Sequence, residues 1–187
     1  MLLLAAAREE LGELAGEAVG LGPVVSASRA ASIVGQRAPE AVVLVGTAGA
    51  YPGGPPIGAA VASRRVGLSW GVAVMGLGYV PRPPRAVEAA AEMLDLLDLP
   101  RHDVLTVGAV TTDLTLAERL ADGWTVEHLE AFGVAYACQR HGVPFVAVLG
   151  IANQVGPDAH AQWLMNREAA REAARRAITR LLGPTLG

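Results

Sequence analysis

Apolar residues recur along this chain with two different periods. Short, nearly continuous apolar runs, some rich in β-branched residues, predict buried strands at 1–7, 41–45, 103–110 and 145–149. Longer stretches, in which apolar residues lie three and four positions apart, predict amphipathic helices at 8–19, 85–99 and 164–182. Of the strands, 41–45 is typical of a central parallel strand because it is apolar throughout.

Shorter segments fill the gaps between these elements. The pattern predicts further strands at 24–28, 57–64 and 71–75, further helices at 29–37, 114–122 and 131–140, and a Gly/Pro-rich loop at 76–85. Strands and helices alternate with no internal repeat and no separating linker. We therefore predict an α/β protein with one domain, residues 1–187, and a mixed, mostly parallel twisted sheet flanked by helices.

Composition narrows the possible partners. The 187 residues are 52% hydrophobic but only 4% aromatic, so the core must consist of Ala, Val and Leu. A net charge of −3 without a basic run argues against nucleic-acid binding. The opening MLLLAAA is too short for a signal peptide, and no unbroken apolar run reaches about 18 residues. With a single cysteine, these features indicate a cytoplasmic protein with no disulfide and no membrane span.

All 15 basic residues are arginines, which excludes any chemistry based on lysine. A P-loop lysine, a lysine Schiff base and a pyridoxal anchor are all ruled out. Cys138 and His141 lie three residues apart, but no second close pair exists to complete a metal site. We predict no metal and no cofactor, with Cys138 a small core residue.

One stretch matches the GxSxG pattern of serine hydrolases, with Ser69 as the nucleophile. That motif needs a strand before the serine and a helix after it. The residues after Gly71 do not predict a useful helix, so a plain turn is the favoured interpretation and a serine hydrolase the alternative.

The segment 126–155 combines an acid and an amide at the ends of buried elements. Glu130 begins the small-residue helix 131–140, and Asn153 follows the strand 145–149. Each has a plain explanation, a solvent-facing helix-start acid and a turn-forming asparagine. Together they supply a carboxylate for sugar hydroxyls and an amide for a heterocycle. Open α/β sheets bind small molecules where strands end.

Two other strand ends add candidates. Glu10 lies in the first turn of the helix 8–19, where it either faces solvent or is held at the end of the first strand. The Gly-rich stretch 46–54 follows the central strand and allows backbone amides to approach a ligand. Its spacing fits neither a dinucleotide fingerprint nor a P-loop.

These segments resemble the nucleoside phosphorylase and nucleosidase superfamily. VEHLEA at 126–131 is similar to the family's E-x-M-E-G/S-A box, and VPF followed by GIAN at 150–153 is similar to its V-P-F…R-x-I-S-D/N strand. VGTAGAYPG at 45–53 resembles its G-x-A-G strand end. The stretches GTAGAYPGG, VEHLEAFGVA and IANQVGPDAHAQW resemble the futalosine hydrolase branch more than the phosphorylases.

The resemblance implies hydrolysis of a ribosyl C–N bond, with futalosine giving hypoxanthine and dehypoxanthine futalosine in menaquinone biosynthesis. Glu10 would activate water, Glu130 would hold the ribose hydroxyls and Asn153 would stabilise the leaving purine. An amide can donate to a 6-oxo group but cannot protonate N7, so Asn153 favours hypoxanthine or guanine over adenine. The remaining residues that the resemblance places at the substrate are Thr47, Ala48, Gly49, Leu129, Phe132 and Ile151.

Several departures keep alternatives open. Leu129 replaces the usual Met, Phe132 replaces a smaller residue, and Leu149 stands where an Arg is common. The alternatives are a purine nucleoside phosphorylase, a 5′-methylthioadenosine/S-adenosylhomocysteine nucleosidase-like enzyme, and a nucleoside-binding protein without catalysis. A weak phosphate-site match at 27–29 favours hydrolysis. The resemblance also implies a homodimer or higher homo-oligomer.

Overall fold

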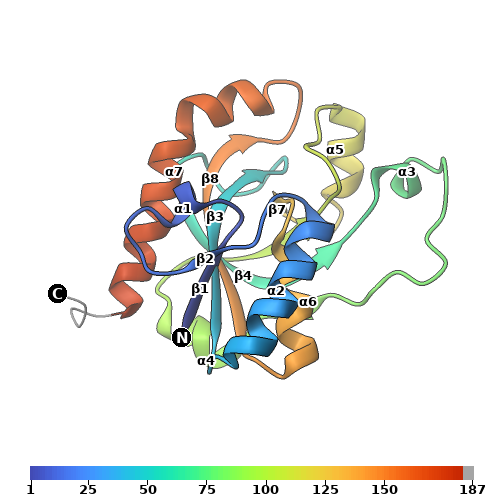
Figure 1. Cartoon of the computed structure of the whole chain (residues 1–187). Helices are drawn as coiled ribbons and strands as arrows, with labels where there is room; N and C mark the ends of the chain where they lie inside the picture. Colours follow the sequence, from blue (N-terminus) through green and yellow to red (C-terminus); the bar gives the residue numbers. More distant parts are fainter. Residues whose placement is uncertain (183–187) are drawn as a thin grey trace.

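A computed structural model describes residues 1–182, and the last five residues of the predicted domain lie outside this range. Strands and helices alternate as expected, except that β4 follows β3 directly (Figure 1). The strands are β1 (Leu2–Ala5), β2 (Glu17–Ala18), β3 (Val42–Ala50), β4 (Ala60–Leu68), β5 (Val87–Glu88), β6 (Arg101–Thr106), β7 (Val126–His128) and β8 (Phe145–Gln154). The helices are α1 (Arg8–Leu11), α2 (Pro23–Arg37), α3 (Gly71–Val74), α4 (Ala91–Leu96), α5 (Leu114–Leu120), α6 (Ala131–His141) and α7 (Ala159–Leu182).

The eight strands form one mixed sheet around the long strands β3 and β8. β3 pairs with β1 and β8 in parallel and with β7 antiparallel. β8 also pairs antiparallel with β4, which pairs in parallel with β6, and β6 pairs in parallel with β7. The strands β3, β8, β4, β6 and β7 therefore close into a ring, with β1 and β2 extending the sheet on one side. The predicted class and the mostly parallel pairing are confirmed.

Helices cover both faces of the sheet (Figure 1). Along β3, Val42 and Leu44 pack in the cluster that contains α2 and α6, whereas Val43 and Val45 pack in the cluster that contains α7. This is the alternation of a strand that is buried on both faces. Gly150 of β8 permits the close packing of α7, because a Cβ there would lie 1.9 Å from a backbone oxygen of that helix.

Several predicted boundaries are wrong. The stretch 24–28 is helical, because the chain enters α2 at Pro23, and Val24 is 80% exposed instead of buried in a sheet. The helix predicted at 8–19 ends at Leu11, since Gly12 takes a φ of 59° and the chain returns to form β2 beside β1. The stretch 71–75 forms the one-turn helix α3 instead of a strand.

The segment 85–99 also differs from its prediction, since it contains β5 and only the six-residue helix α4. Strand β7 was missed because its three residues, VEH, carry no apolar alternation. β3 and β8 are longer than their apolar runs, because they pair with each other beyond the stretches 41–45 and 145–149.

Candidate functional site

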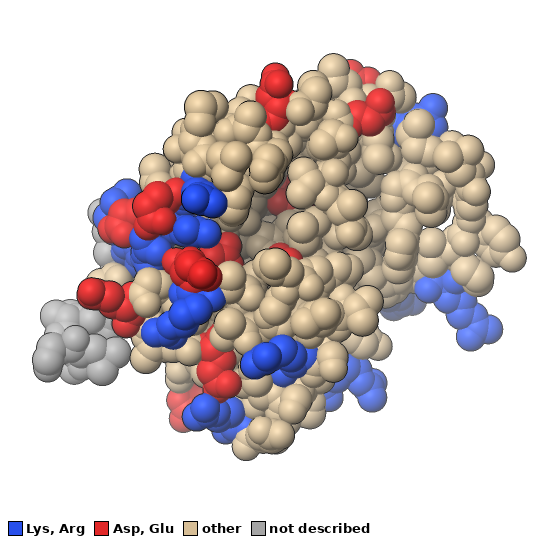
Figure 2. All heavy atoms as spheres, turned by 45° about the horizontal axis from the view of Figure 1, so that its top comes forward, with Lys and Arg blue, Asp and Glu red and all other residues tan. Residues whose placement is uncertain are grey.

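A cavity of about 410 Å³ opens at the ends of β3, β7 and β8, a size suited to a small organic ligand. Figure 2 shows a hollow near the centre of this face, with acidic atoms visible inside it. The lining residues come from widely separated stretches of the chain. They are Ala6, Ala7, Glu10, Leu21, Thr47, Ala48, Gly49, Val110, Glu127, His128, Leu129, Glu130, Asn153, Ala159, His160, Trp163 and Arg171.

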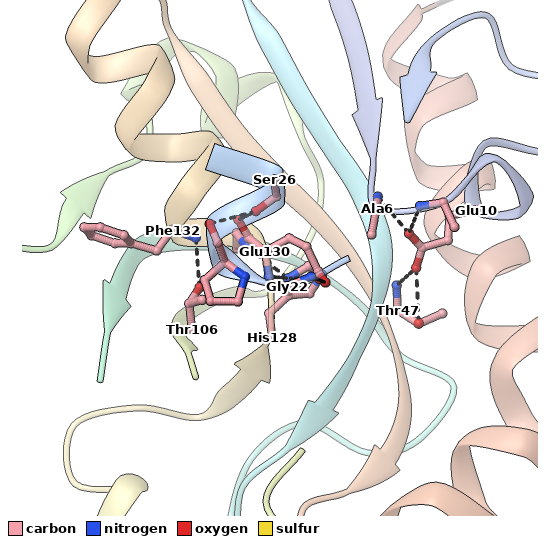
Figure 3. Close-up of polar contacts among 12 residues, drawn as sticks. Ala6, Glu10, Gly22, Ser26, Thr47, Thr106, His128, Glu130 and Phe132 are labelled. Atoms are coloured by element: carbon pink, nitrogen blue, oxygen red, sulfur yellow. Dashed lines mark hydrogen bonds and ion pairs between the residues drawn. The ribbon is translucent and has the colours of Figure 1, made fainter. Parts of the chain in front are cut away.

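Glu10 is held rigidly at one side of the cavity (Figure 3). Its Oε2 accepts hydrogen bonds from the amides of Ala6 and Ala7, at 3.1 and 3.4 Å. Its Oε1 accepts from the amide and the hydroxyl of Thr47, at 3.0 and 3.3 Å. Burial raises the pKa of the Glu10 carboxyl, while hydrogen bonds from the amides of Thr47 and Ala7 oppose that rise. The side chain is therefore a positioned carboxylate with enhanced basicity.

Thr47 and Gly46 shape the surroundings of Glu10. The indole Nε1 of Trp163 donates to the hydroxyl oxygen of Thr47 at 3.1 Å, which leaves the hydroxyl hydrogen free to point at Glu10. A Cβ at Gly46 would come within 3.1 Å of the Glu10 carboxylate. Strand β3 thus supplies both a donor and the space that the carboxylate needs.

Glu130 lies at the other side of the same cavity (Figure 3). Its Oε1 accepts from the amide of Gly22 at 2.7 Å, and its Oε2 lies 3.3 Å from Nδ1 of His128. That Nδ1 already accepts from the amides of Glu130 and Ala131, both at 3.0 Å, so the hydrogen of the neutral ring is on Nε2. The contact between Glu130 and His128 is therefore not an ion pair.

Burial lowers the pKa of His128 to about 4, which agrees with a neutral ring that accepts at Nδ1. Burial also raises the pKa of Glu130, although the amide of Gly22 counteracts this. A neighbour that only accepts hydrogen bonds leaves Oε2 of Glu130 without a donor from His128. Hydroxyl groups of a ligand can fill that role.

Asn153 faces the cavity because of a bulge in β8. Ala48 pairs with Ile151 and the next residue, Gly49, pairs with Asn153, so β8 carries one extra residue between them. Ile151 consequently packs in the core, while Asn153 lines the cavity. A Cβ at Gly49 would lie 2.9 Å from Nδ2 of Asn153, so a larger residue there would displace the amide from its present position.

A third buried carboxylate, Glu127, has fixed partners within the protein. Its oxygens accept from the hydroxyl of Tyr51 at 2.9 Å and the amide of Thr111 at 3.0 Å. Burial raises its pKa, and hydrogen bonds from Thr111 and Tyr51 oppose the rise. These contacts tie Glu127 of β7 to Tyr51 and to the backbone at Thr111, and they brace β7 against the cavity wall.

The structure brings together most of the predicted site residues. Lining positions are occupied by Glu10, Thr47, Ala48, Gly49, Leu129, Glu130 and Asn153. Contrary to the prediction, Phe132 and Ile151 do not line the cavity. Phe132 stacks on Tyr136 at 5.7 Å and points away from Glu130 (Figure 3), because helix periodicity turns it toward the core.

The other candidate chemistries gain no support from the geometry. Ser69 is not among the lining residues, and Cys138 is a buried core residue whose pKa burial raises to about 12. Within residues 1–182, no group of three or more His, Cys, Asp or Glu side chains is arranged to hold a metal ion. Over the same range, no helix combines the length and the apolar character needed to cross a bilayer.

Sequence reasoning missed His128, His160, Trp163 and Arg171 as cavity residues. The last three lie on α7, and the helix expected from 164 begins earlier, at Ala159. No periodic signal marked these three, because the face of α7 that carries them points to the cavity and not to the core.

The fold and the site define a class. The chain belongs to the phosphorylase superfamily, whose pattern matches residues 14–183, and the predicted resemblance is confirmed. A futalosine hydrolase of Thermus thermophilus is 32% identical over 178 residues, covering 87% of this chain and 78% of that protein. A 5′-methylthioadenosine/S-adenosylhomocysteine nucleosidase of an Exiguobacterium species is 29% identical over 158 residues, covering 75% of this chain and 67% of that protein.

Solved structures share the architecture at lower identity. The 5′-methylthioadenosine/S-adenosylhomocysteine nucleosidase of Neisseria meningitidis, in complex with methylthio-immucillin-A, has a TM-score of 0.84 and 16% identity. The match covers 97% of each chain, which confirms the nucleosidase-type fold.

Proposed function

We propose that the protein is a purine nucleosidase that hydrolyses the ribosyl C–N bond of futalosine, a step of menaquinone biosynthesis. The observation that carries this proposal is the convergence of Glu10, Glu130 and Asn153 on one cavity. The similarity to futalosine hydrolase and to 5′-methylthioadenosine/S-adenosylhomocysteine nucleosidase supports the same class of reaction.

Hydrolysis of this bond passes through an oxocarbenium-like state, so the enzyme must place a water and stabilise the leaving base. Glu10 is suited to activate the water, because its carboxylate is fixed by four donors and made more basic by burial. A positioned general base contributes about 10²–10⁴-fold to the rate. Glu130 is suited to accept the ribose hydroxyls through Oε2, which has no donor from His128.

Asn153 supports a 6-oxopurine as the base. Its Nδ2 donates to the carbonyl of Gln154 at 3.0 Å, which uses one of the two amide hydrogens. The second hydrogen remains for an acceptor such as the 6-oxo group of hypoxanthine. An adenine nucleoside would place its exocyclic amine, a second donor, against the Asn153 donor. This contact is unfavourable and argues against the adenine-specific nucleosidase.

A homo-oligomer follows as part of the proposal. Two apolar residues that line the cavity, Leu21 and Val110, are 71% and 49% exposed, so the cavity has apolar surface open to solvent. A second copy of the chain that covers them would close the cavity against water. A monomer that retains full activity would contradict this assembly.

The test is to incubate the protein with futalosine and with inosine in phosphate-free buffer and to measure free hypoxanthine. We expect release from futalosine, with a free sugar hydroxyl as the second product. If release requires phosphate and yields a sugar 1-phosphate, the protein is a phosphorylase. Tight nucleoside binding with no turnover under either condition would instead indicate a protein without catalysis.

A further inference from the structure

Arg171 is a cation at the cavity that the proposed chemistry does not use. Its side chain is only 13% exposed, and it is the one arginine among the described residues that line the cavity. Three buried carboxylates line the same space, namely Glu10, Glu127 and Glu130. Each of these acids has protein hydrogen-bond donors.

The protein does not supply acceptors for all the hydrogen-bond donors of the Arg171 guanidinium. Its NH1 group donates to Glu168 at 3.3 Å, but Glu168 is 70% exposed and makes a closer contact of 2.7 Å with Arg175. Within residues 1–182, its Nε is a buried atom without a hydrogen-bond partner. A buried guanidinium with an unpaired donor is costly unless another group completes it.

Aromatic groups lie beside this cation. The rings of His160 and Trp163 stack with centroids 6.1 Å apart and an interplanar angle of 19°. The guanidinium of Arg171 lies 6.0 Å from the centroid of the Trp163 ring. Both rings line the cavity, so this wall offers flat apolar surface next to a positive charge.

We propose that Arg171, Trp163 and His160 form an anion subsite that takes a carboxylate borne on a planar substituent of the nucleoside's ribose. This inference rests on the proposed nucleosidase function and deepens it. A guanidinium matches the flat geometry of a carboxylate, and the aromatic rings match a planar group that carries it. The subsite would select an acidic nucleoside over a neutral one.

A carboxylate fits better than a phosphate. A dianionic phosphate is usually held by several donors, whereas this wall has one guanidinium that lines the cavity. The guanidinium of Arg167 lies 5.0 Å from the ring centroid of Trp163, but Arg167 is exposed and does not line the cavity. Futalosine, whose ribose carries a carboxyphenyl group, has the required chemistry.

The experiment compares kcat/KM for futalosine, its methyl ester and inosine, using the wild type, Arg171→Met and Arg176→Met. Arg176 is the matched control, since it lies on the same helix but is 60% exposed and pairs with Glu172. We expect Arg171→Met to reduce kcat/KM for futalosine by about 10- to 100-fold, chiefly through KM, as for loss of a charge-assisted hydrogen bond. Turnover of the ester and of inosine should change by less than about threefold, and Arg176→Met should change nothing.

The wild type supplies a test that does not depend on any variant folding, because futalosine should be preferred to its ester by at least about tenfold. Equal turnover of acid and ester, or an equal loss on futalosine and inosine in Arg171→Met, would overturn the subsite. Inosine 5′-monophosphate is assayed as a fourth substrate, and a loss of its turnover in Arg171→Met with no loss for futalosine would assign the subsite to phosphate and contradict the proposal. No turnover of any nucleoside by the wild type would instead count against the nucleosidase function.

Discussion

Glu10 and Glu130 are two buried carboxylates of the same cavity, yet the protein holds them differently. Both oxygens of Glu10 accept hydrogen bonds from the protein, from two amides at the start of α1 and from Thr47 on β3. Glu130 accepts from Gly22 through one oxygen, and its second oxygen faces a histidine nitrogen that is itself an acceptor.

The difference separates two roles. A carboxylate that the protein holds through both oxygens keeps one orientation, which suits contact with a single placed water better than adaptation to a moving ligand. One with an open oxygen can bind hydroxyl groups whose positions change during the reaction. We therefore propose that Glu10 serves the chemistry and Glu130 serves sugar binding, so variants of the two acids should differ in the kinetic constant that they change.

The Glu10→Gln substitution should have the largest effect on activity. The amide keeps the shape and one acceptor but cannot take a proton, so kcat for hypoxanthine release should fall by about 10²–10⁴-fold. Glu130→Gln retains a carbonyl acceptor and should raise KM with a smaller loss of kcat. A fall in kcat of less than about threefold for Glu10→Gln would remove Glu10 from catalysis.

Gly49→Ala should act through Asn153. The added Cβ would lie 2.9 Å from Nδ2 and 3.1 Å from Val155, so the amide must move. Misplacement by about an ångström lowers kcat/KM by on the order of 100-fold. Gly78→Ala is the control, because a Cβ there meets nothing within 4 Å. Equal kcat/KM for the two variants would show that Asn153 does not need its present position.

His128→Asn tests the neutral histidine beside Glu130. The folded pKa of about 4 lies below the ordinary value of 6.5, so the unfolded chain binds a proton first as pH falls. The stability contributed by His128 should therefore be complete above a pH of about 6.5 and be lost progressively toward a pH of about 4. Each tenfold difference in proton affinity between the folded and unfolded chains corresponds to about 1.4 kcal/mol.

Urea unfolding of the wild type and His128→Asn across this range measures the difference directly. Asparagine can accept from the same amides but does not titrate, so the wild type's advantage should shrink as pH falls. A difference that stays constant with pH would mean that His128 binds its proton equally well in the folded and unfolded chains, and would contradict the lowered pKa.

Trp163→Phe should have the smallest effect. It removes the donor to Thr47 and frees the threonine hydroxyl to turn away from Glu10. Loss of a hydrogen bond of about 1 kcal/mol corresponds to roughly a fivefold fall in kcat. Inosine is the substrate to use, because it lacks the acidic group assigned to the Arg171 wall. An unchanged kcat would show that Thr47 orients Glu10 unaided.

Local pattern was enough to predict the strands and helices that cross the core. The runs 41–45 and 145–149 became β3 and β8, since buried parallel strands are apolar throughout. Local pattern did not predict the features that depend on which strands pair with each other. Ring closure, the bulge beside Gly49 and strand β7 depend on partners far away in the sequence.

The site residues likewise fall into those that local pattern predicted and those that it did not. Glu10, Glu130 and Asn153 could be recognised because they lie at ends of core elements and match a family pattern. Ile151 was misplaced because alternation does not reveal a bulge one residue later. Trp163 and Arg171 escaped notice because nothing in α7 distinguishes a turn that faces the cavity from one that faces solvent.

A crystal structure of Glu10→Gln with intact futalosine would show directly whether Glu10, Glu130 and Asn153 act on one nucleoside. We expect ribose hydroxyls within about 3.2 Å of the open oxygen of Glu130, a common hydrogen-bond limit, and the 6-oxo group within the same distance of the Asn153 amide. The anomeric carbon should face the substituted side chain at position 10 across a single water molecule. A nucleoside bound elsewhere, or one whose ribose contacts neither acid position, would contradict the proposed roles of these residues.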